Sequence, residues 1–538
     1  MGGMRVEGRV TAGWVAAGLC AAALGVMGRQ VSAAPGQVQG ARGGGQGTEA
    51  DSASRDAGRD DEVRGDRPTE SDRFGRMFHL PPFAPATDAV KAALVRLGSR
   101  GGLLDAADHL EVGPVLLITD PAQSVNNPDN PQDTAGFTFL GQYLDHDMTF
   151  DIASPLGQPT NPSTSVNGRR PYFDLDSLYG AGPVASPLLY DPDDRAKLRI
   201  ENGGLHEDVP RESSGRAIIA DPRNDENVII SGLQAAMILA HNRLVDDVRL
   251  ADPTLDYASV FARARQQLTW HYQWIIVHEF LPKLVGQPLV DRVLAEGPRF
   301  YHPRQDDAYM PVEFQVAYRM GHSMVRPSYR ANFTGLGGSP FFALVFDPSQ
   351  SGALDPSDLR GGVRSPRRFV GWTTFFRFPG FEGDTRPNKR IDTHLSSPLY
   401  TLPLGAIASG TPPTQLAERN LLRHVTWSLP SGQAVARAMD VPVLPASQLS
   451  ELAGIYPSFV RSTPLWYYVL KEAEVTQQGL QLGPMGGRLV AEVFIGLLQS
   501  DSASYLHAEP AFIPSLGATA GSFTMVDLLT FAGVGGRR

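Results

Sequence analysis

The sequence is 538 residues long, 42% hydrophobic and 20% charged, a balance typical of globular proteins that excludes a wholly disordered chain and one with many membrane spans. Its 48 basic and 57 acidic residues give a formal net charge of −9, so it lacks the basic character of a dedicated nucleic-acid binder, and we expect no nucleic-acid partner. The single cysteine, Cys20, excludes a disulfide framework, a zinc finger and a cysteine nucleophile.

The first 33 residues have the pattern of an export signal. Arg5 and Arg9 precede an apolar run from Trp14 to Met27, and residues 31–33 have the small-residue spacing that a signal peptidase accepts. We therefore expect a signal peptide over residues 1–33, a secreted or periplasmic (extracellular) protein, and no stable membrane insertion after cleavage. An amphipathic first helix or a single short anchor is the alternative interpretation of the same residues.

The next segment, residues 34–76, is rich in Gly, Ser, Asp, Glu and Arg and has few large apolar residues. Such a segment buries too little surface to offset its ordering entropy, so we predict a disordered, acidic and Gly-rich linker. From residue 77 to residue 538 we find no break in composition and no repeat of 20 to 50 residues. We predict one domain over residues 77–538.

Helical periodicity dominates this domain, whereas runs with the alternation of a strand are few and short. The 56 Gly and 43 Pro predict long connections between the helices. The sequence therefore predicts a mainly α fold, a single large helical domain with long loops and few short strands. The expected helices are Ser231–Leu250, Asp256–Leu281 (ended by Pro282), Val435–Met439, Leu465–Leu470 and Leu489–Leu498.

Common signatures of nucleotide, zinc-protease and serine-hydrolase chemistry are absent: the sequence has no GxxxxGK[ST], HExxH or GxSxG motif. Polar groups instead interrupt apolar helical segments. If residues 137–150 form a helix, Gln142, Asp145 and His146 share one face, and Asp147 is turned about 100° away. One face could then serve a pocket and the other a cation, although an amphipathic helix with a polar edge has the same pattern.

Four further segments carry paired polar groups. The loop around residues 171–180 has alternate carboxylates, which suit a hard cation such as calcium but also occur in solvated turns. In the other three, an arginine stands three residues from a carboxylate, a histidine or an amide; each alone could be a solvated helix edge or a surface ion pair. These pairs are Arg223 with Glu226, Arg319 with His322, and Asn420 with Arg423.

Taken together and in this order, the motifs resemble the animal haem peroxidase family from about Phe78 to the C-terminus. The matching residues are Gly141, Gln142, Asp145, His146 and Asp147 for the distal element, Arg223 and Glu226 followed by the HNRL of residues 241–244, Arg319 to His322 for the proximal element, and Asn420, Arg423, Leu429 and Pro430. His271 and His278 lie outside these motifs, and we expect them to be packing residues.

The resemblance implies a haem b cofactor and a peroxidase. His322 would be the axial ligand of the haem iron, oriented by Asn420, with Arg319 and Arg423 beside the haem. His146 would act as acid and base, with Arg223 and Gln142 as its catalytic neighbours. The enzyme would reduce hydrogen peroxide through a ferryl intermediate and oxidise a small donor such as a halide or a phenol.

Two alternatives stay open. A fatty-acid dioxygenase or cyclooxygenase of the same superfamily would need a tyrosine three residues before the proximal histidine, where Arg319 stands, and we expect the neighbouring Tyr318 to point elsewhere. A non-enzymatic secreted adhesion protein would be free to lose His146 or Arg223, and both are present.

The resemblance also concerns covalent haem attachment and calcium. Asp145 and Glu226 match carboxylates that can form ester bonds to the haem, whereas Asn227 replaces the methionine of the sulfonium bond, which we expect to be absent. Calcium would be bound by Asp147, the carbonyl of Tyr172, Asp174 and Asp176, and Arg170 stands where the family usually has threonine. The donor, the covalent bonds and the oligomeric state are left open.

Overall fold

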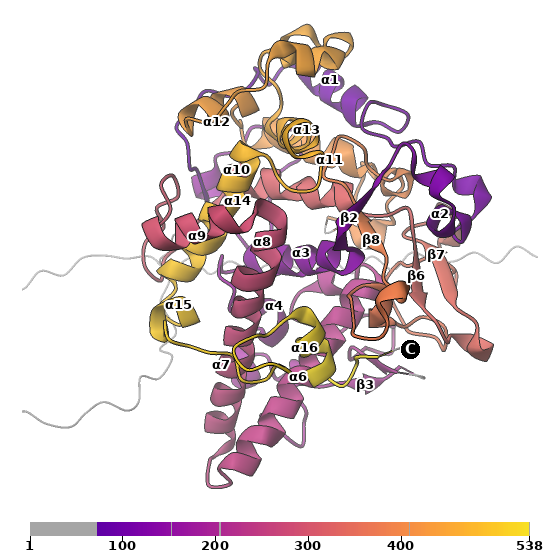
Figure 1. Cartoon of the computed structure of the whole chain (residues 1–538), viewed down its shortest axis with the longest axis vertical. Coiled ribbons are helices and arrows are strands. Elements are labelled where there is room, and N and C mark those ends of the chain that lie inside the picture. Colours follow the sequence, from indigo (N-terminus) through magenta and orange to yellow (C-terminus); the bar gives the residue numbers. More distant parts are fainter. Residues whose placement is uncertain (1–72, 152, 204–205, 408, 537) are drawn as a thin grey trace, which may run out of the picture. The chain divides into compact units, whose positions relative to one another are not determined.

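The computed structural model describes residues 73–538 except 152, 204–205, 408 and 537 (Figure 1). The predicted signal peptide and residues 34–72 of the predicted linker lie outside the described residues. The end of that linker prediction is wrong: Phe74 and Gly75 form strand β1, and the side chain of Phe74 is 1% exposed. An apolar ring explains the difference, because Phe74 packs against Trp427 with 5.2 Å between ring centroids.

The predicted mainly α fold is confirmed. The α-helices are α1 Asp88–Gly98, α2 Leu116–Thr119, α3 Ala135–Met148, α4 Asp176–Tyr179, α5 Gly182–Ala185, α6 Val228–Ala251, α7 Tyr257–Ile275, α8 Leu281–Val285, α9 Gln287–Glu296, α10 Val312–Ala317, α11 Leu416–Thr426, α12 Gly432–Ala438, α13 Leu465–Gln477, α14 Pro484–Ser500, α15 Tyr505–Ala508 and α16 Met525–Phe531. Short 3₁₀ turns connect them, and two matter below: η6, Pro222–Asp225, and η8, Tyr318–Met324.

The strands are few and short, as predicted. They are β1 Phe74–Gly75, β2 Asp129–Thr134, β3 Glu201–Asn202, β4 Glu207–Asp208, β5 Met310–Pro311, β6 Ser328–Asn332, β7 Phe341–Leu344 and β8 Pro387–Lys389. They pair as two-stranded ladders: β1 with β5 in parallel, and β2 with β8, β3 with β4, and β6 with β7 antiparallel. These ladders tie loops to the helical core and build no extended sheet.

The helix that begins after Asp256 passes the proline that was expected to end it. Helix α7 continues into a π-helical turn, Ile276–Phe280, and then into α8, where Pro282 lies in the first turn. Proline lacks a backbone N–H, but the first N–H groups of a helix need no helical partner, so the wider turn accommodates it. Gly286, with φ of +83°, ends the helical run instead.

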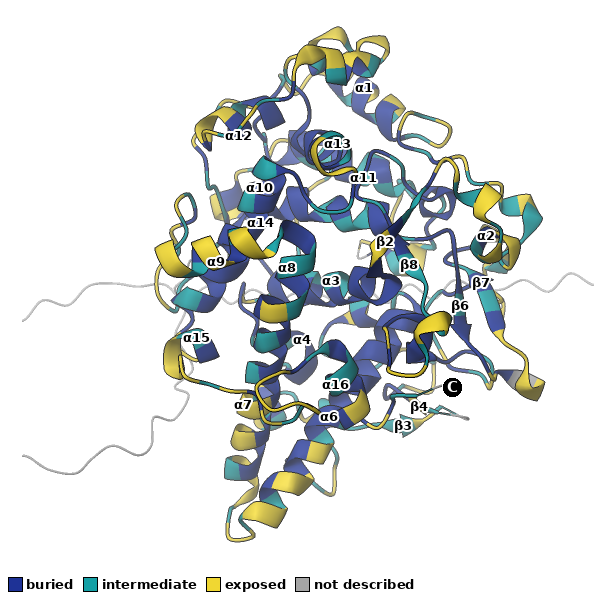
Figure 2. Ribbon diagram, in the orientation of Figure 1, coloured by how far each residue is buried: buried dark blue, intermediate teal, exposed yellow. Residues whose placement is uncertain are grey.

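Helix α3 lies at the centre of the described region and packs against α6, β8 and the turn η8 (Figure 1). Most residues of α3 and α14 are buried, whereas α6 is buried along its first half and carries exposed residues toward its C-terminal end (Figure 2). Among the described residues, α6 is the helix long and apolar enough to cross a membrane, yet 78% of its apolar window is buried inside the protein. It is therefore a core helix, and it holds α3 in place.

Candidate active site

A cavity opens between α3 and the turn η8. About 250 Å³ of it is accessible to the centres of water molecules, and both His146 and His322 line it. The first histidine comes from the last turn of α3 and the second from η8, which follows α10 directly. Two imidazoles that are 176 positions apart in the sequence thus share one internal space, whose wall combines apolar side chains with a few charged ones.

On the α3 side, His146 is buried, and its Nδ1 lies 2.8 Å from the Oδ1 of Asn224 in η6. The amide oxygen can only accept, so Nδ1 carries the proton and donates it to Asn224. Burial, followed by the nearby charge of Arg223, lowers the pKa of His146 to about 3. The imidazole is therefore neutral near pH 7, and its Nε2 keeps a lone pair that can accept a proton.

Arg223 lies beside His146 and is held from three directions. Its Nε and Nη2 donate to the carboxylate of Asp221 at 3.0 and 2.7 Å, its Nη2 also donates to the carbonyl of His146 at 3.1 Å, and its guanidinium lies 4.3 Å from the ring centroid of Phe150. Arg169 donates to the same Asp221 carboxylate at 2.8 Å. Burial opposes the ionised form of Asp221, yet the charge and hydrogen bonds of Arg223 lower its pKa overall. A fixed positive charge therefore faces the cavity.

Gln142 lies one turn before His146 and is also fixed at both ends. Its Nε2 donates to Glu226 at 3.1 Å, and its Oε1 accepts from Asn227 at 3.3 Å. Asn227 also caps α6 by accepting from the first N–H groups of that helix. Burial raises the pKa of Glu226 to about 8, against the opposing effect of Arg223. Glu226 and Asp145 both line the cavity, and Asp145 is 32% exposed toward open space.

On the opposite side, His322 meets the residue expected to orient it. Its Nδ1 is 2.7 Å from the Nδ2 of Asn420 in α11, and Arg319 donates to the Oδ1 of the same amide at 3.3 Å. Burial and then the charge of Arg319 lower the pKa of His322 to about 3. In this amide orientation Nδ1 is an acceptor; rotating the amide by 180° would let Nδ1 donate and free Nε2 for a metal.

Three arginines line this side of the cavity: Arg319, Arg419 and Arg423. Arg423 forms an ion pair with Asp151, and Arg419 donates to backbone carbonyls of the preceding loop. The Nε of Arg319 is buried without a hydrogen-bond partner, and burial together with Arg423 lowers its pKa to about 10. This surplus of buried positive charge fits an anionic group, as the two carboxylates of a haem would provide.

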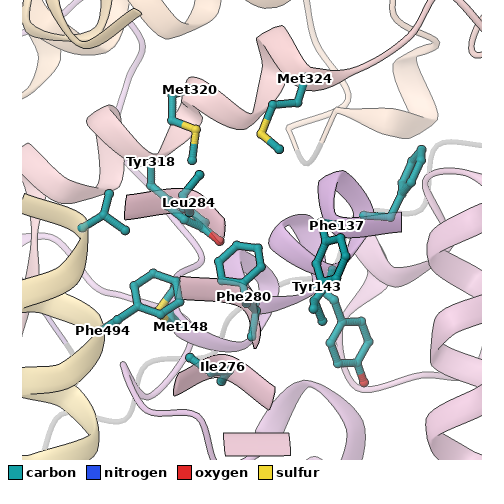
Figure 3. Packing of buried hydrophobic residues seen from close by; sticks show 14 of the residues in the cluster. Phe137, Tyr143, Met148, Ile276, Phe280, Leu284, Tyr318, Met320, Met324 and Phe494 are labelled. Carbon is teal, nitrogen blue, oxygen red and sulfur yellow. The ribbon is translucent and has the colours of Figure 1, made fainter. Parts of the chain in front are cut away.

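Tyr318 contradicts the expectation that it points away from the site. It lines the cavity, and its hydroxyl donates to the carbonyl of Gly141 at 3.2 Å. In Figure 3 it extends from η8 together with Met320 and Met324 toward Phe280 and Phe137. Tyr318 follows α10 directly and precedes His322 by four positions, a spacing that already places two side chains on one face of an α-helix.

The three predicted calcium-binding carboxylates come together behind α3. One oxygen each from Asp147, Asp174 and Asp176 lie within 4.8 Å of one another. The Oδ1 of Asp176 is buried without a hydrogen-bond partner, and burial and then Asp174 raise the pKa of Asp147 to about 7. Tyr172, on the same loop, accepts from the N–H of Ala308 with its hydroxyl. This donor set fits a hard cation.

Arg170 lies at the edge of the same cluster. Its Nη1 donates to Asp174 at 3.2 Å, and its guanidinium lies 5.2 Å from the ring centroid of Tyr172. About half of its side chain is exposed. It therefore neutralises part of the carboxylate charge from outside and leaves Asp147 and Asp176 to the interior.

The sequence analysis missed several groups that the structure brings to the site. Asp221 and Arg169 fix Arg223, Asn224 and Gln234 stand behind His146, and Arg419 joins the arginine group. A carboxylate two residues before Arg223 was a usable signal, whereas neutral amides carry no charge pattern. His271 and His278 do not line the cavity: His271 bonds to backbone groups, and His278 stacks on Trp274 at 3.8 Å.

Comparison with known proteins agrees with this geometry. The sequence profile of the animal haem peroxidase domain matches residues 153–335, the part of the chain that contains Arg223, Glu226 and His322. This part of the chain is similar to the animal haem peroxidase family. Eosinophil peroxidase from Mus musculus is 28% identical over 233 residues, which is 38% of this chain and 32% of that protein. The matches span only 17% to 32% of the length of the first four curated relatives.

Two solved structures share the fold. Peroxidase A from Dictyostelium discoideum superposes with a TM-score of 0.58 at 16% identity, over 87% of this chain and 95% of that one. A fatty acid alpha-dioxygenase from Oryza sativa superposes with a TM-score of 0.55 at 13% identity, over 81% of this chain and 76% of that one. The helical scaffold around the cavity is therefore common to both kinds of protein.

Proposed function

We propose that this chain is a haem-dependent peroxidase that reduces hydrogen peroxide and oxidises a small donor such as a halide or a phenol. One observation carries the proposal: two neutral imidazoles line the same cavity. His146, whose Nε2 is free, lies beside the fixed Arg223, and His322 lies among further arginines. The similarity of residues 153–335 to the animal haem peroxidase domain supports the same cofactor, haem b.

When bound, the haem supplies a redox-active iron that exchanges electrons between peroxide and donor. His322 would bind the haem iron, and Asn420 would orient its imidazole. Arg319 and Arg423 are the proposed partners of the haem carboxylates, because they present buried positive charge to the cavity. These residues hold and orient the group, and the proton transfers fall to the opposite side of the cavity.

His146 performs the proton transfers in this proposal. Its Nε2 takes the proton from one oxygen of hydrogen peroxide and returns it to the other oxygen, which leaves as water. Arg223 stabilises the negative charge that develops as the bond between the oxygens breaks, and Gln142 positions the peroxide or a water beside them. Two electrons from the donor and two protons complete the reduction of peroxide to two molecules of water.

Other features extend the proposal. Asp145 and Glu226 line the cavity and are the candidates for ester bonds to the haem, while Asn227 offers no sulfur for a third bond. Calcium is the proposed ion at Asp147, Tyr172, Asp174 and Asp176, where it would lock the end of α3 that carries His146. A signal peptide over residues 1–33 and export of the domain remain part of the proposal.

An oxygenase acting on fatty acids is the second candidate, because the fold is shared with the dioxygenase from Oryza sativa and Tyr318 faces the cavity. Against it, the position three residues before His322 holds Arg319. Oxygen uptake with a long-chain fatty acid, measured beside peroxide consumption with guaiacol, bromide or iodide, separates the two candidates. We expect turnover only with peroxide and a small donor.

The decisive test is spectroscopic. Purified chain titrated with haem should develop a Soret band that shifts when peroxide is added. His322→Ala should lose the histidine-ligated spectrum. His146→Ala should keep that spectrum and react with peroxide about 10²- to 10⁴-fold more slowly. The control His278→Ala, which alters an exposed histidine, should behave as the unmodified protein. No Soret band, or an undiminished rate in His146→Ala, would overturn the proposal.

A further inference from the structure

Behind His146 lies a buried row of uncharged polar side chains that the proposed mechanism does not use. The Oδ1 of Asn224 accepts from His146 at 2.8 Å, and the Nδ2 of Asn224 donates to the Oε1 of Gln234 in α6 at 2.9 Å. The hydroxyl of Tyr143, on α3, donates to the same Oε1 at 3.1 Å. The side chains of His146, Asn224, Gln234 and Tyr143 are all buried, so water does not compete for these bonds.

The direction of donation in this row is consistent from end to end. Burial and then the charge of Asp147 raise the pKa of Tyr143, so its hydroxyl stays a donor. The oxygen of Gln234 accepts from Tyr143 and from Asn224, which orients the Asn224 amide with its oxygen toward the imidazole. Reversing that amide alone would set two donors against each other at His146 and two acceptors against each other at Gln234, and each of these buried contacts would be unfavourable.

We infer that Asn224, held by Gln234 and Tyr143, is the positioning residue that keeps the proton of neutral His146 on Nδ1 and thereby keeps Nε2 free to accept the proton of peroxide. The inference rests on the proposed function for its catalytic meaning, but the tautomer itself is a property of the chain. Asn224 touches neither peroxide nor haem in this assignment, and it acts only through the imidazole.

A neutral amide in this place differs from a carboxylate in its effect on the imidazole. A carboxylate partner would orient the ring and also stabilise its charged form. The charges around His146 are Arg223, Asp221 and Arg169, and Asp221 is already engaged by both arginines. Asn224 therefore orients the ring without adding charge, so a proton taken up by Nε2 is readily given on to the leaving oxygen.

The first test reads the tautomer directly. Full-length chain labelled with ¹⁵N-histidine, haem-free and haem-loaded, is compared with His146→Gln, so that the signal of His146 is found among the 12 histidines by difference. We expect the ¹⁵N shifts of an Nδ1–H imidazole in the unmodified chain and in Asn224→Asp, which keeps an acceptor. Asn224→Leu, or the smaller Asn224→Ser if the leucine variant does not fold, should give a mixture or the Nε2–H form.

The second test measures the reaction with peroxide in a double-mutant cycle. Asn224→Leu should lower the rate about 10²-fold or more with an unchanged Soret band, and the same substitution in His146→Ala should change the rate less than about two-fold, because its only route of action is gone. An unchanged tautomer in both Asn224→Leu and Asn224→Ser, or additive losses in the cycle, would overturn the assignment.

These readouts also separate this inference from the proposed function. If the haem-loaded chain fails to react with peroxide while removal of the Asn224 amide still changes the tautomer of His146, the peroxidase proposal falls and the positioning role stands. If peroxide reacts through His146 but the tautomer is indifferent to position 224, the positioning role alone is wrong.

Discussion

The two sides of the cavity differ in how their arginines are held. Arg223 has a buried carboxylate, a peptide carbonyl and an aromatic ring around it, and Asp221 raises its pKa although burial opposes this. Arg319 has one hydrogen bond of 3.3 Å, a buried Nε without a partner and a lowered pKa. The charge of Arg223 is thus balanced within the protein, whereas Arg319 forms no ion pair with another described residue, which is the arrangement expected if an anionic cofactor binds beside it.

Removing the carboxylate that completes the α3 side should have the largest effect. Asp221→Asn leaves the charges of Arg223 and Arg169 without their shared partner in a buried place, which should lower the free energy of unfolding by about 3–5 kcal/mol. Denaturant unfolding followed by circular dichroism measures this. Asp193→Asn, at an exposed loop position, is the control and should change stability by less than about 0.5 kcal/mol. Equal stability of the two variants would contradict the comparison.

On the η8 side, the same kind of change should affect haem binding more than folding. Arg319→Leu removes an unpaired buried charge from the haem-free chain, so it should not destabilise that chain. It should weaken haem binding about 10- to 100-fold, the equivalent of a charged hydrogen bond of about 1.5–3 kcal/mol. Absorbance titration with haem measures the affinity, with the exposed Arg437→Leu as the matched control. Tighter haem binding by Arg319→Leu, or a less stable haem-free variant, would show that Arg319 does not bind an anionic group of the haem.

The sequence predicted the groups that lie close together along the chain, and it did not predict those assembled from distant segments. Arg223 with Glu226, and Arg319 with His322, are local motifs, and their spacing was sufficient to select them. The row from Tyr143 to Asn224 and Gln234 is assembled from α3, η6 and α6, and neutral amides in a helix have no pattern that distinguishes a network from ordinary polar positions.

Backbone geometry limited the prediction in a different way. The direction of Tyr318 was misjudged because only the residue three positions before His322 was assigned to its face, whereas the residue four positions before it shares that face of an α-helix as well. The helix expected to stop at Pro282 continues because a π-helical turn precedes it. A π-helical turn has no signature in the hydrophobic periodicity of one segment, so the sequence could not predict it.

The acidic cluster behind α3 resembles the η8 side, because it too has a buried atom without a hydrogen-bond partner: the Oδ1 of Asp176, which lies 3.9 Å from the Nε of Arg169. Calcium at a hundred times its dissociation constant should stabilise the chain by about 2.7 kcal/mol, and a chelator should remove this gain. Asp176→Asn should reduce the response, and Arg170→Thr, which removes the competing cation, should increase it. Denaturant unfolding with and without calcium measures the stabilisation of each variant. If calcium stabilises neither the unmodified chain nor Arg170→Thr, the ion does not bind there.

The smallest expected change concerns pH, and it tests the completeness of the α3 side. A free histidine loses its proton near pH 6.5, so an exposed base would slow the reaction with peroxide severalfold between pH 7 and pH 5.5. Burial and Arg223 lower the pKa of His146 to about 3; the base is therefore neutral throughout this range and is lost only as pH falls toward 3. The bimolecular rate constant with peroxide, measured by stopped-flow, should vary less than about two-fold from pH 5 to pH 7. A decline centred near pH 6.5 would mean that His146 is not shielded by its buried neighbours.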